Sequence, residues 1–267
     1  MSVRTRCGFL LAIAVAGALP AAAQETVLLR LDPPVGQVTR QRLESKMWMR
    51  SGTVMPSDTT APNFSQVMFS TQTVAADEAG IRTITTVIDS SRLEMGPGAP
   101  QLGAGADLLK GTRTIQRVNA DGDLLSSSTV PGPNAPPMMV GQMGGFGAPP
   151  GQQRYPKHPL RVGDTWTDTT TQSGQGRSAT TVTTLRVEHI EQSAGSQLAT
   201  ISVKGGSSVP ADSAHATSVT GELTGEMVVD VTHRRMVSLM NESRTRIDSP
   251  NGPQSSFMRM TITLIEP

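Results

Sequence analysis

Aromatic residues, cysteine and long hydrophobic runs are all scarce in this sequence. Phe, Trp and Tyr make up 3% of the 267 residues, so there are few platforms on which nucleic-acid bases or sugar rings could stack. The single cysteine, Cys7, lies close to the N-terminus, so the chain beyond it has no thiol nucleophile and no cysteine metal ligand. Beyond the first 23 residues no apolar run reaches the ~20 residues of a membrane-spanning helix, so we expect no transmembrane segment there.

The N-terminal segment has the residue order of a secretory signal peptide. Two arginines precede an apolar run from Phe9 to Leu19, and small residues follow as far as Ala23. This order predicts a signal peptide at 1–23, cleavage after Ala23, and a periplasmic or extracellular mature protein. Without this segment, 21 basic residues stand against 22 acidic ones, a net charge of −1. A nearly neutral chain with scattered charges gives no reason to expect nucleic acid as a partner.

Alternation with a period of two dominates the rest of the chain. In residues 38–50, one set of alternate positions carries Arg, Glu and Lys together with Trp48, and the other carries Leu43, Met47 and Met49. The second set is the drier one, so the pattern predicts a strand with one buried face. Similar runs, rich in Thr and Val, favour strands over long helices. These runs are residues 65–74, 81–89, 113–119, 180–190, 197–204, 226–232 and 236–248.

Turn signals agree with a strand-rich chain. Asp121-Gly122 is typical of a tight hairpin, and only Asp107–Lys110 suggests a short helical turn. The fold class that follows is mainly β and antiparallel with few short helices. It is built either as two related β-units or as one strongly curved, half-barrel sheet.

A Pro- and Gly-rich segment at 131–157 interrupts the strand pattern. Proline removes hydrogen-bond donors and glycine raises the entropic cost of order, so this segment is either a disordered tether or a hydrophobic flap. The flap interpretation depends on its apolar side chains, which are Met138, Met139, Met143 and Phe146. The expected organisation is a signal peptide at 1–23, a first β-unit at 24–130, the linker or loop at 131–157, and a second β-unit at 158–267.

The two units show a faint internal repeat. Pro33-Pro34-Val35-Gly36 precedes the first long strand as Pro159–Trp166 precedes the second set. The stretch Tyr155–Trp166, with its Val-Gly-Asp-x-Trp element, resembles a group of secreted bacterial proteins of unknown function. In that group a Pro-rich lead, this element and a strand-dense tail recur. The resemblance covers the second half well and the first half weakly, and it implies a β-rich exported domain with no assigned activity.

A looser likeness, by architecture alone, is to periplasmic lipoprotein carriers whose open curved sheet holds acyl chains. The Val-Gly-Asp-x-Trp element also has a structural interpretation. Gly163 permits a turn, Asp164 accepts backbone N–H groups, and Trp166 anchors the strand that follows. We favour this structural role over ligand binding for the three residues.

Motifs for catalysis or metal binding are absent. The four histidines are scattered at His158, His189, His215 and His233, and no cofactor or metal site is expected. Residues 119–123 resemble a calcium loop only superficially, because the glycine is misplaced and no bidentate Glu follows. Asp230, His233 and Ser238 are the nearest approach to a hydrolase triad, and they lie within one hairpin.

We therefore expect a non-enzymatic binding or carrier domain for an apolar or amphipathic ligand, such as a lipid. The residues that suggest it are apolar, flexible or aromatic side chains on expected strand faces. They are Met47, Met49, Val67, Met68 and Phe69. Two alternatives stay open: an envelope module that pairs its strands with a protein partner, and a hydrolase whose site is not visible in the sequence.

Overall fold

The computed structural model describes residues 25–30, 33–76, 80–96, 107–119, 124–135, 155–174, 177–211 and 216–265. The expected signal peptide at 1–23, the Asp121-Gly122 turn, His215 and residues 136–154 of the Pro/Gly-rich segment lie outside the described residues. At Asp107–Gly111 the chain forms hydrogen-bonded turns, one of which joins Lys110 N–H to the Asp107 carbonyl at 3.1 Å.

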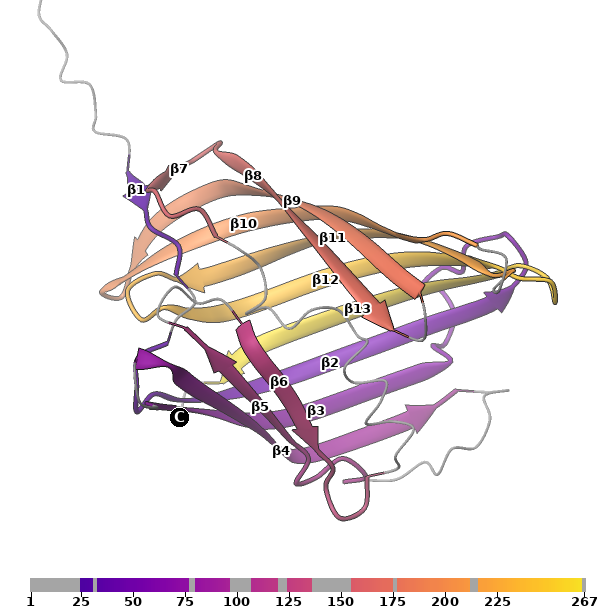
Figure 1. The fold of residues 1–267 in the computed structure, drawn as a ribbon, viewed down its shortest axis with the longest axis horizontal. Coiled ribbons are helices and arrows are strands. Elements are labelled where there is room, and N and C mark those ends of the chain that lie inside the picture. Colours follow the sequence, from indigo (N-terminus) through magenta and orange to yellow (C-terminus); the bar gives the residue numbers. More distant parts are fainter. Residues whose placement is uncertain are drawn as a thin grey trace, which may run out of the picture.

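The chain is almost entirely antiparallel β-structure, which confirms the expected fold class (Figure 1). One sheet has eleven strands in the order β6-β5-β4-β3-β2-β13-β12-β11-β10-β9-β8, and a second pairs β1 with β7. The strands are β1 (Thr26–Val27), β2 (Val38–Ser51), β3 (Phe64–Ala76), β4 (Arg82–Met95), β5 (Arg113–Val118), β6 (Leu124–Val130), β7 (Leu160–Arg161), β8 (Thr165–Gly174), β9 (Arg177–Ser193), β10 (Ser196–Val209), β11 (Ser218–Asp230), β12 (Arg235–Asp248) and β13 (Gln254–Ile265).

A single pairing, between β2 and β13, joins the first and second halves of the chain into one sheet. Met47 lies opposite Met258, and Trp48 lies opposite Phe257 in this ladder. Every other neighbouring pair in the large sheet consists of strands that follow each other in sequence. Of the two expected forms of the fold, the chain therefore adopts the single curved sheet.

The large sheet curls so that its edge strands, β6 and β8, turn toward the same side (Figure 1). Register shifts interrupt four of its ladders, and such bulges increase local twist and bend a strand. The shifts lie at Phe69/Ser70, Arg117/Val118, Thr200/Ile201 and Val228/Val229. The curvature gives the sheet a concave face and a convex face.

The main core fills the concave face over strands β9 to β13. Its members are aliphatic side chains and methionines at alternate positions, as the period of two requires. The small β1–β7 ribbon packs onto them through Val27 and Leu160, and Leu29 follows the ribbon into the same core. The sheet residues of this core are Leu185, Val187, Ile190, Ala199, Ile201, Val203, Met227, Val229, Met236, Leu239 and Ile262.

A smaller packed group lies on the convex face under the loop that joins β2 and β3. The ring of Trp48 stacks on Phe257 with centroids 5.3 Å apart, and its Nε1–H donates to the Thr60 carbonyl at 2.8 Å. Arg259 holds the same loop through Asp58, at 2.9 Å. Trp48 belongs to the charged face of its strand, yet this loop buries it to 4% exposure.

Three strands are entered through the same kind of glycine turn. In each turn a glycine with positive φ donates its N–H to the neighbouring strand at 2.8 Å, and the next residue accepts a bond back from that strand. The glycines and their acceptors are Gly36 with Val74, Gly111 with Ile88, and Gly163 with Val187. The turn at Gly163 is closed further by Asp164, whose carboxylate accepts the Arg161 N–H at 2.8 Å.

Two strand glycines give a matched test of packing in the sheet. A Cβ added at Gly225 would collide with the Met240 carbonyl and the Asn241 side chain, whereas one at Gly206 meets only the Gly221 carbonyl at 3.5 Å. We expect Gly225→Ala to lower the free energy of unfolding by about 1–3 kcal/mol, since backbone must move. Gly206→Ala is expected to be neutral or stabilising by up to about 1 kcal/mol. Urea unfolding of both variants measures the difference; equal stability of the two would contradict this packing.

Candidate functional site

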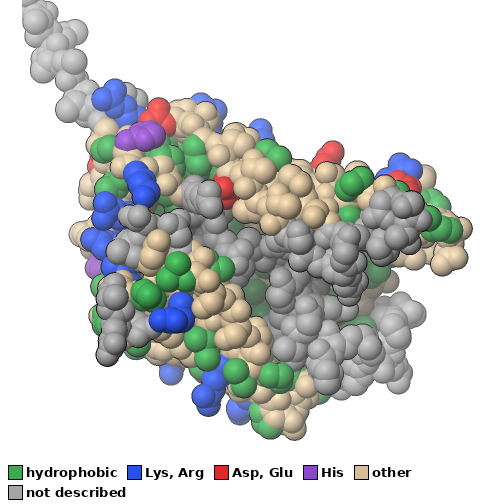
Figure 2. Space-filling view, viewed as in Figure 1, with side chains coloured by type: hydrophobic (Ala, Val, Ile, Leu, Met, Phe, Trp, Pro, Cys, Tyr) green, Lys and Arg blue, Asp and Glu red, His purple; other side chains and the backbone are tan. Residues whose placement is uncertain are grey.

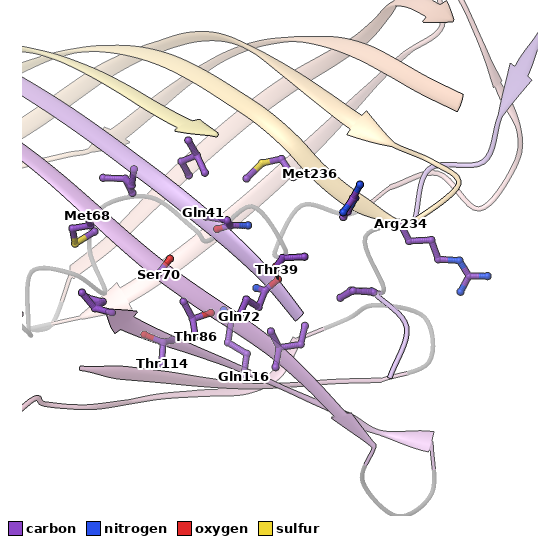
Figure 3. Close-up of a pocket in the computed structure, with 16 residues that line it drawn as sticks. Thr39, Gln41, Met68, Ser70, Gln72, Thr86, Thr114, Gln116, Arg234 and Met236 are labelled. Atoms are coloured by element: carbon purple, nitrogen blue, oxygen red, sulfur yellow. Dashed lines mark hydrogen bonds between the residues drawn. The ribbon is translucent and has the colours of Figure 1, made fainter. Parts of the chain in front are cut away.

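A cavity of about 260 Å³ lies on the concave face, beside the main core (Figure 3). Strands β2 to β5 supply most of its lining, and β12, β13, the turn before β12 and Pro33 supply the rest. The lining residues are Pro33, Thr39, Gln41, Leu43, Met68, Ser70, Gln72, Ile84, Thr86, Ile88, Thr114, Gln116, Arg234, Arg235, Met236 and Ile262.

The cavity combines neutral polar and apolar side chains. Hydroxyl and amide groups come from all four strands β2 to β5, and Figure 3 shows Ser70, Gln72, Thr86 and Thr114 close together on this side. The apolar contribution comes from Leu, Ile and Met residues of β2, β3, β4, β12 and β13. A site of this composition suits a molecule that is mostly apolar and carries a few hydrogen-bonding atoms.

Over β2, β3 and β10 to β13 the two faces of the sheet differ sharply in charge, whereas Arg82 of β4 and Asp168 of β8 share the inward register. Among residues that share the face of Leu43, Met68 and Met236, none is Asp, Glu, Lys or Arg in β2, β3 or β10 to β13. Arg235 pairs with Asp230 and therefore alternates to the opposite face from Met236. The opposite positions carry ion pairs such as Glu44 with Lys46 and Arg42, and hydrogen bonds from these two cations lower the pKa of Glu44. In Figure 2 the charged side chains lie mostly around the outline and form no single patch.

Methionine is concentrated on the concave face. Of the ten methionines in the described part of the chain, eight share the inward register. Met240 points outward, and Met55 lies in the loop after β2. The inward ones are Met47, Met49, Met68, Met95, Met227, Met236, Met258 and Met260. Unbranched, polarisable thioethers of this kind adapt to ligands of varied shape.

The residues expected from the sequence to bind ligand are divided between the two faces. Met47 and Met49 share the face of Leu43 and the cavity, although Met49 is 52% exposed. Val67 and Phe69 pair with Glu44 and Arg42 and therefore lie on the convex face. These four residues cannot line one cavity together.

Sequence reasoning missed most of the polar lining. Gln41, Gln72 and Gln116 come from three different strands, β2, β3 and β5, and the register of the ladders brings them to one face. The sequence signal for them is alternation along the strand, because Gln41 lies two residues from Leu43 and Gln72 lies four residues from Met68. A search for charged or aromatic ligand residues does not find them.

The polar cluster at Asp230 does not have the geometry of a hydrolase. Asp230 is 2% exposed, and its Oδ2 lies 2.7 Å from His233 Nδ1. Ser196, and not Ser238, completes the cluster, and its Oγ lies 3.2 Å from the same Nδ1. A catalytic triad places serine and carboxylate on opposite nitrogens of the imidazole. This cluster instead ties the β11–β12 turn to the start of β10.

The cluster makes stability depend on acid pH. Burial raises the pKa of Asp230, but hydrogen bonds from the His233 backbone and ring, with the charges of His233 and Arg235, outweigh burial and lower it. A lowered folded-state pKa stabilises the fold above the unfolded-state pKa of about 3.9, and this contribution is lost as the pH falls through the folded value.

We expect Asp230→Asn to lower the free energy of unfolding by about 2 kcal/mol at pH 6–7, and by progressively less below pH 4. The exposed pair Asp248–Arg246 offers a control, because Asp248→Asn should change stability little at any pH. Urea unfolding between pH 3 and 7 measures both variants. A pH-independent loss in Asp230→Asn would contradict the assigned role.

At the other end of the concave face, Tyr155 packs against Trp166 with ring centroids 6.2 Å apart. Burial, and then the charge of Asp168, raise the pKa of the Tyr155 hydroxyl, which donates to Met227 Sδ at 3.9 Å. The buried Trp166 Nε1 has no acceptor among the described residues. Trp166 therefore joins β8 to the main core mainly through its ring.

The described residues contain no group of three or more His, Cys, Asp or Glu side chains that could hold a metal ion. His158, His189 and His233 lie in separate segments, and His189 pairs with Glu191 at 3.6 Å. In the part of the chain that the structure describes, no helix has the length and apolar character needed to cross a membrane.

No protein-family model and no curated protein matches this sequence. Among solved structures, an outer membrane channel from Pseudomonas putida F1 aligns at a TM-score of 0.29 and 10% identity, over 87% of this chain and 96% of that chain. DynF from the dynemicin biosynthesis pathway of Micromonospora chersina aligns at 0.22 and 9%, over 92% of this chain and 88% of that chain. Scores this low carry no argument about function.

Proposed function

We propose that this chain is a non-enzymatic binding or carrier protein for an amphipathic ligand held on the concave face of the sheet. The observation that carries the proposal is the segregation of charge. The convex face bears the ion pairs, whereas the concave face around the 260 Å³ cavity offers methionine, aliphatic, hydroxyl and amide groups. An unpaired charge is costly to bury, so such a surface selects the apolar part of a ligand.

Among the described residues, packing on the concave face is concentrated over the second half of the sheet, and this supports the proposed role. The β1–β7 ribbon and Tyr155 pack over the strands of the second half, whereas the cavity lies mainly over β2 to β5. Together with the N-terminal segment, whose composition predicts export, this arrangement suggests a carrier that works in the periplasm or outside the cell.

Native mass spectrometry of the exported, gently purified protein, combined with lipid extraction, tests the proposal. We expect a co-purifying apolar or amphipathic molecule that is released on denaturation. Refolded protein, incubated without lipid, serves as the empty reference. An empty spectrum from gently handled protein, with no uptake of added fatty acids or lysolipids, would overturn the proposal.

A further inference from the structure

A row of uncharged polar side chains crosses the cavity from β2 to β5. Thr39 lies opposite Gln72 in the β2–β3 ladder, and Gln72 lies opposite Thr86 in the β3–β4 ladder. Thr86 in turn lies opposite Thr114 of β5, and Figure 3 shows the four side chains following one another along this wall. Because neighbouring strands lie about 4.8 Å apart, this polar row extends for about 14 Å.

Most of the hydrogen-bonding capacity of the polar row is unused within the protein. Thr39 Oγ1 donates a long bond to Gln72 Oε1, at 3.5 Å, and the Gln72 amide nitrogen has no acceptor among the described residues. The hydroxyls of Thr86 and Thr114 make no hydrogen bond to any described residue, although both side chains are half-buried. Polar groups in such a position are satisfied by water or by a ligand.

Among the described lining residues, no charge is free to meet a ligand. Arg234 directs its side chain away from the cavity in Figure 3 and already has an interaction partner. Arg235 pairs with Asp230 at 3.4 Å. Arg82, which shares the inward register of β4, also has a partner and does not line the cavity. A charged group brought to the polar row would therefore lose its hydration without gaining an ion partner.

An apolar row lies parallel to the polar row on the same face. Leu43 lies opposite Met68 in one ladder and opposite Ile262 in the other. Leu43 and Met68 are each four residues along their strands from Thr39 and Gln72, a distance of about 13 Å. One molecule can therefore contact the polar row with one end and the apolar row with the other.

We infer that the ligand is a single-chain amphiphile whose polar end is uncharged and carries hydroxyl or amide groups. The polar end lies along the row from Thr39 to Thr114, and the alkyl chain lies against Leu43 and Met68. Hydroxyls and carboxamides both donate and accept hydrogen bonds, so the polar row matches ligand groups that do the same. This inference rests on the proposed function, and it names the ligand class.

Four probes with alkyl chains of equal length test the inference. Monolaurin and lauramide are uncharged, whereas at neutral pH lauric acid is an anion and laurylamine a cation. Displacement of a fluorescent apolar probe from the full mature chain measures their affinities. We expect at least one uncharged probe to bind about tenfold more tightly than both charged ones, because only the charged ones lose hydration without gaining a partner of opposite charge.

Two variants of matched shape locate the contact. Thr86→Val and Thr114→Val each replace an unpartnered hydroxyl by a methyl group, so urea unfolding should show no loss of stability. Each should weaken binding of the preferred uncharged probe about threefold to tenfold, and leave the affinity of the fluorescent apolar probe within about twofold. Thr85→Val is the control, because Thr85 pairs with Thr73 on the convex face and should change neither affinity.

The outcomes separate the two claims. Lauric acid or laurylamine binding as tightly as both uncharged probes would overturn this inference and leave the proposed function standing. Unchanged affinity for the uncharged probes in both Thr86→Val and Thr114→Val would do the same, since water alone would then satisfy the polar row. Failure of all four probes to bind overturns both claims.

Discussion

Met68→Glu is expected to weaken binding of an apolar ligand tenfold to a hundredfold, whereas Phe69→Glu should change it by less than about threefold. The two residues are neighbours on β3 but lie on opposite faces. Met68 lines the cavity opposite Leu43, where a carboxylate has no cation across the ladder. Phe69 is 39% exposed and lies opposite Arg42. An unpaired polar group buried against ligand costs about 1–3 kcal/mol, and each 1.4 kcal/mol is tenfold in affinity.

Circular dichroism and urea unfolding establish that both variants are folded before fluorescence displacement is measured. Met68→Leu is the conservative control, because it keeps the wall apolar with similar volume, and it should bind within about threefold of the unchanged chain. Equal losses in Met68→Glu and Phe69→Glu would mean that the concave face does not define the binding site.

Trp48→Ala is expected to lower the free energy of unfolding by about 3–5 kcal/mol, the usual cost of removing a buried large aromatic side chain. Trp48 joins β2 to β13 by stacking on Phe257, and it holds the loop after β2 by its bond to the Thr60 carbonyl. Because the β2–β13 ladder joins the two halves of the sheet, the lost packing weakens the pairing between those halves. Urea unfolding of the variant measures the change.

The second tryptophan provides a matched comparison. Trp48→Phe removes a hydrogen bond, whereas Trp166→Phe removes none that the described residues supply. We expect the first change to cost about 1 kcal/mol more than the second. If Trp166→Phe proved the more destabilising of the two, the assigned partners of the two indoles would be wrong.

The sequence predicted most strands because their alternation is local. Val38–Ser51, Phe64–Ala76 and Arg235–Asp248 extend the expected runs at 38–50, 65–74 and 236–248 by a few residues at most. The drier face of β2, with Leu43 and Met47, is the face that turns toward the cavity and the core. A period of two was enough to predict this face.

Long-range features could not be predicted in the same way. Strand β13 was missed, and its pairing with β2 joins residues separated by most of the chain. Trp48 alternates in phase with Arg42 and Lys46, so the sequence assigns it to the wet face; only the packing of the loop at Thr60 buries it. Val67 and Phe69 are expected ligand residues only because they are apolar. Apolar character alone does not tell which face of a strand lies inward.

The candidate site depends on register even more strongly. Gln72 and Gln116 lie on one face because Thr86 pairs with Gln72 and Ile84 pairs with Gln116 in successive ladders. A shift of one residue in either ladder would turn the side chain outward. The expectation of an amphipathic ligand thus follows from composition, while the position of its site follows from strand pairing.

Photo-crosslinking tests most directly the claim that ligand lies on the concave face. The mature chain would be irradiated with a diazirine-bearing fatty acid, digested, and the labelled residues identified by mass spectrometry. We expect labels on inward residues of β2, β3 and β12, such as Leu43, Met68 and Met236, and an excess of unmodified fatty acid should remove them. Competed labels on Val67 or Phe69, with the inward positions unlabelled, would contradict it.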